Sequence, residues 1–321
     1  KSWIIYPQPS VIELYPNMNC KNSHWSSEKN NLGYLIKEIT LVWNISYEKR
    51  CKLINQGITR WDNPYLFTTC ELKNNLSTEI KQKIIHINQQ IDLKISPRKI
   101  KNREFISHLN QKNSIILDIE SVSYLDENNS YFHSKNVLDD KPKICIIGTI
   151  TNHINHTNIF KDFTIQYLTN NEEKKIITHW ISYLKNIFKD EKIFIFHWGN
   201  AEKSYLKYMK NKYPDISFPD IELIDLCVYF KKEPIVIKGC FGYGLKEIAT
   251  YLYNHNFIEN CWEDDLNGLD AMYLLLRFSK KASENKIPMK RYPEIKEIIN
   301  YNYMDCQVLY DIIMFLKIKM I

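Results

Sequence analysis

Ser114-Ile-Ile-Leu-Asp-Ile-Glu120 is a short apolar run that carries two acids near its end. Its β-branched residues and its length predict a buried β-strand. Asp118 and Glu120 are two residues apart, so both side chains are expected to project from the same face of that strand. Two like charges on an otherwise apolar strand have two explanations, which are exposure to solvent at the strand end and a shared cation.

The segments that follow alternate between strand and helix patterns. Runs rich in β-branched and aromatic residues predict strands, whereas apolar residues at intervals of three and four predict helices. The predicted strands are 143–150, 163–167, 192–197 and 221–227, and the predicted helices are 171–188, 201–210, 243–253, 265–280 and 293–318. Three consecutive strands followed by alternating helices predict an α/β fold with a mixed sheet that helices cover on both faces.

The chain before these elements has a different pattern. Residues 34–55 show helical spacing that is interrupted near Asn44, and Ser46 is suited to cap a helix over residues 47–55. Another helix is expected over residues 77–89. The pattern fits a helix-hairpin-helix-like module that grips phosphates, and it also fits a small packing subdomain.

A basic, proline-containing segment, Lys94-Ile-Ser-Pro-Arg-Lys-Ile-Lys-Asn-Arg103, separates the two regions. It is either an exposed linker or a strap that contacts phosphates. Its candidate nucleic-acid contacts are Arg98, Lys99, Lys101 and Arg103. We therefore expect a small, basic, mostly helical domain over residues 1–103 and an α/β domain over residues 104–321.

The composition excludes several classes of protein. Of the 321 residues, 44% are hydrophobic and 13% aromatic, which indicates a globular core and argues against a disordered, collagen-like or coiled-coil chain. The 8 glycines argue against chemistry built on glycine-rich loops. No apolar run approaches the ~20 residues that span a bilayer. Because the sequence starts at Lys1 without a Met or an apolar leader, we expect it to be a fragment of a longer polypeptide.

Cysteine spacing and charge indicate the compartment and the partner. No two of the 8 cysteines lie within four residues of each other, so the C-x-x-C spacing of zinc sites is absent. We expect buried, reduced thiols in an intracellular protein of the cytoplasm or nucleus. The net charge is +6, and the excess of Lys and Arg lies within residues 1–113. A basic region suits a polyanionic partner, although it is also compatible with an ordinary solvated surface.

Another acid follows the predicted strand 192–197, in Phe196-His-Trp-Gly-Asn-Ala-Glu202. Glu202 falls in the first turn of the next helix, where the helix dipole favours a carboxylate even without a catalytic role. His197, at the strand end, is either a core histidine or part of a site.

The last candidate pair lies on the predicted C-terminal helix. Tyr301 and Asp305 are four residues apart, so they share one helical face. An Asp beside apolar residues is costly unless it is paired or bound to a metal. A partly exposed Asp on an amphipathic helix is the alternative.

The order of these residues resembles the DEDD superfamily of 3′–5′ exonucleases, in its tyrosine-containing branch. The resemblance covers most of the chain and is strongest over residues 114–320. The segments Phe196–Leu206, Leu223–Leu226, Gly244–Ile248 and Tyr301–Cys306 are similar to the YprB-like, RecB-associated subgroup of bacteria and large DNA viruses. Members of this subgroup often carry a RecB-like nuclease domain upstream.

The resemblance implies an RNase H-like fold and two-metal hydrolysis of nucleic-acid phosphodiesters from a single-stranded 3′ end. It implies that Asp118, Glu120, Glu202 and Asp305 hold two divalent cations, Mg²⁺ or Mn²⁺, and that Tyr301 orients the attacking water. Glu202 departs from the family, most of which has Asp at that position.

Three further residues are candidate nucleic-acid contacts: His197, Trp198 and Lys246. Asp270 is a reserve ligand should Glu202 be misplaced. The alternative function is a catalytically weak nucleic-acid-binding module of a larger replication, repair or processing protein. The choice between DNA and RNA stays open.

Overall fold

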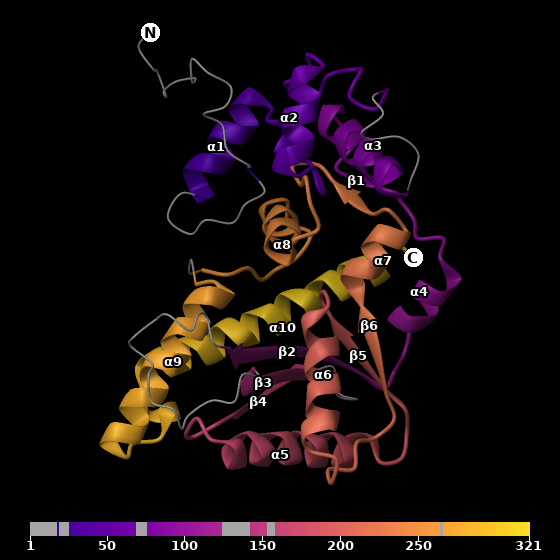
Figure 1. The fold of residues 1–321 in the computed structure, drawn as a ribbon. Helices are drawn as coiled ribbons and strands as arrows, with labels where there is room; N and C mark the ends of the chain where they lie inside the picture. Colours follow the sequence, from indigo (N-terminus) through magenta and orange to yellow (C-terminus); the bar gives the residue numbers. More distant parts are fainter. Residues whose placement is uncertain (1–17, 19–25, 69–75, 124–141, 153–157, 264–265) are drawn as a thin grey trace. The chain divides into compact units, whose positions relative to one another are not determined.

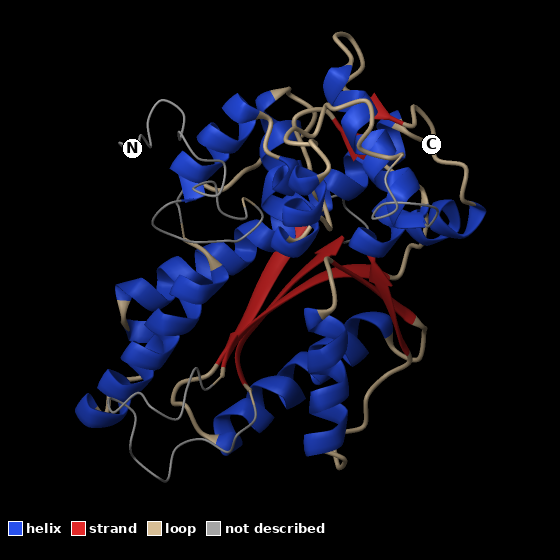
Figure 2. Cartoon of the chain, turned by 45° about the horizontal axis from the view of Figure 1, so that its top comes forward, coloured by secondary structure: helices blue, strands red, loops and turns tan. Residues whose placement is uncertain are grey.

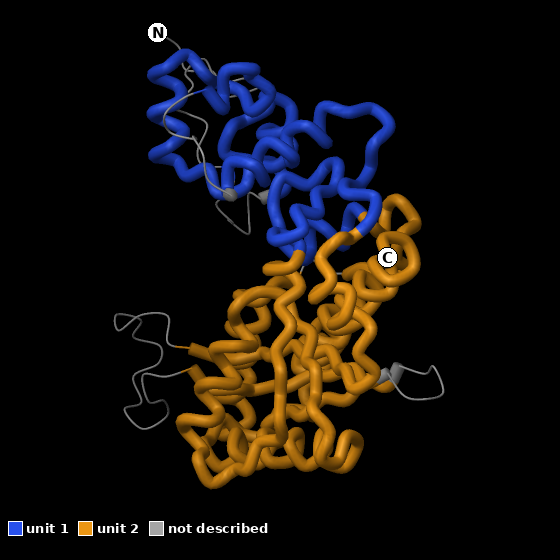
Figure 3. Tube along the Cα trace, turned by 90° about the vertical axis from the view of Figure 1, so that its right-hand side faces the viewer, with its two compact units in different colours: residues 1–99, 230–251 blue, residues 100–229, 252–321 orange. Residues whose placement is uncertain are grey.

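The computed structural model describes Met18 and residues 26–68, 76–123, 142–152, 158–263 and 266–321. The chain folds into two compact units, which Figure 3 shows in different colours. One comprises residues 1–99 and 230–251, and the other comprises residues 100–229 and 252–321. Residues 230–251 thus join the unit that contains the N-terminal residues, and the domain division at residue 103 stays a prediction.

A five-stranded mixed sheet forms the centre of the larger unit (Figures 1 and 2). Its order is β4-β3-β2-β5-β6, where β2 pairs antiparallel with β3 and parallel with β5. The strands are β2 (Ser114–Val122), β3 (Lys143–Asn152), β4 (Asn158–Thr164), β5 (Ile193–His197) and β6 (Ile221–Asp225). The predicted α/β fold with a mixed sheet is confirmed.

Helices cover both faces of this sheet, as predicted. Figure 1 shows α10 (Pro293–Lys319) on one face and α5 (Asn170–Phe188) on the other. Ile115, Leu117 and Ile119 of β2 are buried in the main apolar core, together with residues of α5 and α6. The remaining helices of this unit include α4 (Arg103–Leu109), α6 (Ala201–Lys212) and α9 (Gly268–Asn285).

The smaller unit is mostly helical. It contains a two-stranded antiparallel ribbon, β1 with β7, and a buried ion pair in which Arg50 Nε lies 2.6 Å from Glu38 Oε1. Its elements are α1 (Ser26–Ile36), η2 (Ile39–Leu41), α2 (Tyr47–Asn55), α3 (Leu76–Gln89), β1 (Ile95–Ser96), β7 (Val236–Ile237) and most of α8 (Leu245–Asn254).

Two predicted elements differ from the structure for local reasons. The prediction that helical structure continues from Tyr34 was wrong, because α1 ends at Ile36. Lys37 and Asn44 adopt positive φ, which a continuing helix does not allow. The strand expected to run to Cys227 ends at Asp225, and α7 (Leu226–Lys232) begins at once.

The helix cap and the cysteines can be compared with the predictions residue by residue. The cap by Ser46 is confirmed, since its side chain accepts a hydrogen bond from Lys49 N. The six described cysteines form no disulfide with one another, and Cys20 and Cys70 lie outside the described residues. Among the described residues, no helix is long and apolar enough to cross a membrane.

Candidate active site

Strand β2 presents two acids on the face opposite the main core. Successive side chains of a strand alternate between faces, so Asp118 and Glu120 point away from the side occupied by Leu117 and Ile119. The pairing of β2 with β3 is irregular between Glu120 and Ser121, a β-bulge of the kind that re-aims side chains next to functional sites.

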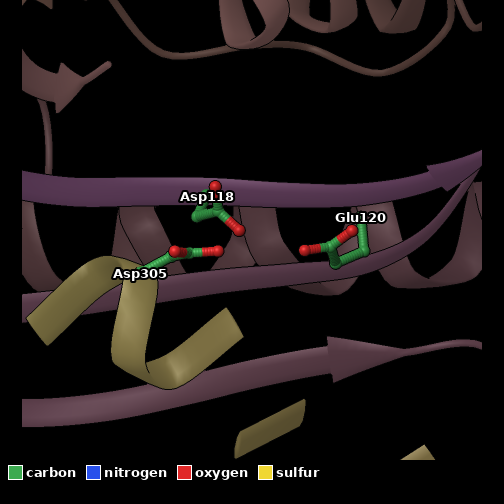
Figure 4. Close-up of side chains that lie close together, drawn as sticks. All are labelled: Asp118, Glu120 and Asp305. Atoms are coloured by element: carbon green, nitrogen blue, oxygen red, sulfur yellow. The ribbon is translucent and has the colours of Figure 1, made fainter. Parts of the chain in front are cut away.

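Helix α10 brings a third acid to this face. One ligand oxygen each of Asp118, Glu120 and Asp305 lies within 4.8 Å of the others, and Figure 4 shows the three carboxylates turned toward one another. Tyr301, one turn before Asp305 on the same face of α10, donates its hydroxyl hydrogen bond to the Asp305 carboxylate. The predicted pairing of the strand acids with the helix acid is therefore present in the structure.

Burial and mutual repulsion both disfavour the charged forms of the acids in this cluster. The pKa of Asp118 is raised well above its ordinary value of 3.8, first by burial and then by the negative charges of Asp305, Glu120 and Glu202. The pKa of the Tyr301 hydroxyl is also raised, mainly by burial and then by Asp305. A divalent cation would relieve this repulsion, and an all-carboxylate donor set is the kind that Mg²⁺ and Mn²⁺ prefer. The cluster could therefore hold a metal ion.

Glu202 is near this cluster but outside the group of three. It lies in the first turn of α6, is 5% exposed, and raises the pKa of Asp118. Its Oε2 atom is 3.3 Å from His197 Nδ1, yet neither atom has a hydrogen-bond partner among the described residues. A buried carboxylate oxygen without a donor is costly unless a cation approaches it, which is a second observation that fits a metal.

The turn between β5 and α6 sets the position of Glu202. Gly199 has a φ of 91°, which a residue with a side chain rarely adopts. Asp225, at the end of β6, fixes this turn because its Oδ1 accepts hydrogen bonds from Gly199 N at 3.0 Å and from Val228 N at 3.3 Å. Asp225 therefore has a structural role.

The other predicted site residues are not part of the acidic cluster. His197 is 1% exposed, and its role as a nucleic-acid contact stays a prediction. Trp198 and Lys246 are partly exposed, and Lys246 lies in α8 within the smaller unit. Asn267 caps α9 by accepting from Leu269 N and Asp270 N, and its Nδ2 donates to the carboxylate of Asp270 in the first turn. The four basic residues predicted to contact phosphates are exposed: Arg98, Lys99 and Lys101 precede α4, and Arg103 is its first residue.

Three further residues, which were not predicted from the sequence, make contacts with the acids or with their neighbours. Asn302 Nδ2 donates to Asp118 Oδ2 at 2.6 Å, and Trp262 Nε1 donates to Asp305 Oδ1 at 3.0 Å. Tyr205 OH lies 2.5 Å from Ser121 Oγ, and its pKa is raised by burial and then by Glu120, Glu202 and Asp118. The i, i+3 spacing of Asn302 and Asp305 was a usable signal, whereas the sequence around Trp262 offered none.

A sequence model of the RNase_H superfamily matches residues 136–316, which is more than half of the chain. The chain therefore belongs to the RNase_H superfamily. The match includes Glu202, Tyr301 and Asp305, while Asp118 and Glu120 precede it and join the site through the sheet. No curated protein and no solved structure matches the chain. Superfamily membership and the acidic cluster together indicate a nuclease, and such domains act on nucleic acids.

Proposed function

We propose that this protein is a metal-dependent 3′–5′ exonuclease that hydrolyses nucleic-acid phosphodiester bonds by a two-metal mechanism. The observation that carries the proposal is the convergence of Asp118, Glu120 and Asp305 within 4.8 Å in a chain of the RNase_H superfamily. Glu202 completes the set of four carboxylates that would hold two Mg²⁺ or Mn²⁺ ions, since its buried oxygen lacks a donor. Bound divalent cations lower the pKa of water and neutralise charge on the scissile phosphate.

The chain's own residues have distinct roles in this proposal. Tyr301 stays a neutral phenol because its pKa is raised, so it can donate or accept a hydrogen bond and orient the attacking water. Asp305 holds the Tyr301 hydroxyl, and Trp262 in turn donates to Asp305. The reaction therefore needs no titration of the phenol at neutral pH.

The polarity of digestion and the partners rest on the resemblance to the tyrosine-containing DEDD exonucleases. In this proposal a single-stranded 3′ end enters the site, and Arg98, Lys99, Lys101 and Arg103 contact backbone phosphates together with Trp198 and Lys246. Each of these lies in the described chain, and the four side chains of the basic segment are exposed, as phosphate contacts require. An upstream RecB-like domain and a role in DNA repair or in a virus stay predictions of the resemblance.

The test is cleavage of 5′-labelled single-stranded DNA and RNA with Mg²⁺, Mn²⁺ or EDTA. Asp305→Asn removes one cluster charge, and Glu297→Gln removes an exposed charge from the same helix as a matched control. We expect a ladder that shortens from the 3′ end and that disappears with EDTA and in Asp305→Asn but not in Glu297→Gln. Cleavage that survives EDTA or Asp305→Asn would contradict the proposal, and folded protein that binds strands without cutting them would favour the binding module.

A further inference from the structure

Asn302 links helix α10 to a carboxylate of the acidic cluster on strand β2. Its side chain is fully buried on α10, three residues before Asp305, and its Nδ2 donates to Asp118 Oδ2 at 2.6 Å. The Asn302 amide thus links strand β2, which carries Asp118, to helix α10, which carries Asp305. Metal coordination by carboxylates does not by itself require an amide here.

Gly148 of β3 makes room for this amide. It is the pairing partner of Asp118 across the sheet, so the two residues lie side by side. A Cβ placed on Gly148 would come within 1.7 Å of Asn302 Oδ1 and 2.7 Å of Asn302 Cγ. Real Cβ atoms do not approach this closely, so any side chain at position 148 would displace Asn302. Lack of space, rather than backbone conformation, explains why glycine is required at this position.

The orientation of the amide follows from its neighbours. Reversing it would place the amide oxygen 2.6 Å from a carboxylate oxygen, which is repulsive while Asp118 is charged. In the favourable orientation Oδ1 is buried without a hydrogen-bond partner among the described residues. Leaving a buried oxygen unsatisfied costs stability. An apolar side chain of similar size would fill the same space without that cost, so packing alone does not account for Asn302.

We propose that Asn302 is a positioning residue that fixes the Asp118 carboxylate for divalent-cation binding, and that Gly148 provides the space that admits it. The donated N–H restricts rotation of the Asp118 carboxylate and leaves its Oδ1 available to a cation. Because Asn302 and Asp305 lie on one helix, the same contact also fixes the distance between the strand ligand and the helix ligand. This inference rests on the proposed function.

Direct measurement of Mn²⁺ binding, by electron paramagnetic resonance of free Mn²⁺, tests the inference without relying on cleavage. Asn302→Leu keeps the size and removes the donor, and Gly148→Ala keeps the donor but displaces it. Asn300→Leu, at an exposed position of α10, is the matched control. We expect Kd for Mn²⁺ to rise about tenfold or more in the first two variants, as is typical when the partner of a metal ligand is lost, and to be unchanged in the control.

A double-mutant cycle separates positioning from general damage. If Gly148→Ala acts through Asn302, it should weaken Mn²⁺ binding in the wild-type background and add nothing in an Asn302→Ala background. Equal losses in both backgrounds, or a folded Asn302→Leu variant with wild-type affinity, would overturn the inference. If Gly148→Ala fails to fold, as its thermal unfolding would show, Asn302→Leu against Asn300→Leu still decides.

The outcomes also distinguish the inference from the proposed function. Wild-type protein that binds Mn²⁺ but cleaves nothing would contradict the nuclease, while the effect of Asn302→Leu on affinity would still decide the positioning role. Wild-type protein that binds no Mn²⁺ would overturn both.

Discussion

Tyr301 is the residue whose role is easiest to separate from metal binding. Its hydroxyl contacts Asp305, but Tyr301 is not one of the three acids that could hold the metal ion. We predict that Tyr301→Phe lowers kcat about 100-fold, at the lower end of what a positioned proton-transfer or water-orienting group contributes. Its Kd for Mn²⁺ should stay close to that of the wild type, as measured by binding assays beside single-turnover cleavage.

Tyr303→Phe is the control for this change. Tyr303 lies two residues further along α10, and its ring packs edge-on against Phe160. The loss of its hydroxyl should leave kcat unchanged. A Tyr301→Phe variant with full activity would remove Tyr301 from the mechanism.

Replacing Glu202 is expected to change stability and metal binding in opposite directions. Its buried oxygen has no donor, so Glu202→Gln should remove an unfavourable charge and raise the free energy of unfolding in EDTA by about 1 kcal/mol. The same change should weaken Mn²⁺ binding if Glu202 is a ligand. Thermal unfolding with EDTA and with Mn²⁺ measures both effects, and a variant that binds Mn²⁺ as tightly as the wild type would exclude Glu202 as a ligand.

Among the structural elements, the turn from β5 to α6 depends on a residue from another strand. Asn200, at the start of α6, makes no side-chain cap, and Asp225 instead accepts from Gly199 N and Val228 N. Asp225→Ala leaves two backbone donors without this acceptor. We predict a loss of about 1–2 kcal/mol of stability, measured by urea unfolding, and a weaker affinity for Mn²⁺ because Glu202 follows this turn.

Asp220→Ala is suited as the control for that prediction. Asp220 is an exposed acid just before the same strand, β6, so its removal changes the net charge equally. Equal stability and equal Mn²⁺ affinity of the two variants would show that Asp225 does not hold the turn.

The predictions for elements succeeded where the signal was local. A capping serine and a helical apolar pattern predicted α2, and two acids spaced by two on an apolar run predicted the shared face of β2. They failed where backbone conformation broke the pattern, since Lys37 adopts positive φ although nothing in its side chain requires it. The short helix α7 was missed because strand β6 passes into that helix without a Gly or Pro between them, and apolar residues predominate in both.

For the whole molecule, the acidic cluster couples stability to pH and to cations. Asp118 has a pKa above its ordinary value of 3.8, so it holds its proton longer in the folded than in the unfolded chain. Its contribution to stability is therefore present at low pH and is lost as the pH rises from about 4 through the raised pKa. In EDTA we predict that Tm falls over this window, and that the fall is smaller in Asp118→Asn.

Adding the cation should reverse that loss. A ligand that binds only the folded chain stabilises it by about 2.7 kcal/mol at roughly 100 times its Kd. We therefore predict that Mn²⁺ raises Tm more at pH ~8 than at pH ~5, because cations compete with protons for the carboxylates. Differential scanning fluorimetry measures Tm at each pH with and without Mn²⁺. A Tm that depends on neither pH nor Mn²⁺ would contradict a cation site in this cluster.

Strand and helix periodicities are local properties of the chain, so the amino-acid sequence was enough to predict the fold class, the face shared by Asp118 and Glu120, and the face shared by Tyr301 and Asp305. That β2 and α10 bring these faces together is visible in the folded chain alone. Only the tertiary structure showed that Asn302 contacts Asp118 over Gly148 and that Asp225 holds the turn before Glu202. These contacts join residues far apart in the chain, and no spacing along a sequence encodes which strand pairs with which or what a helix covers.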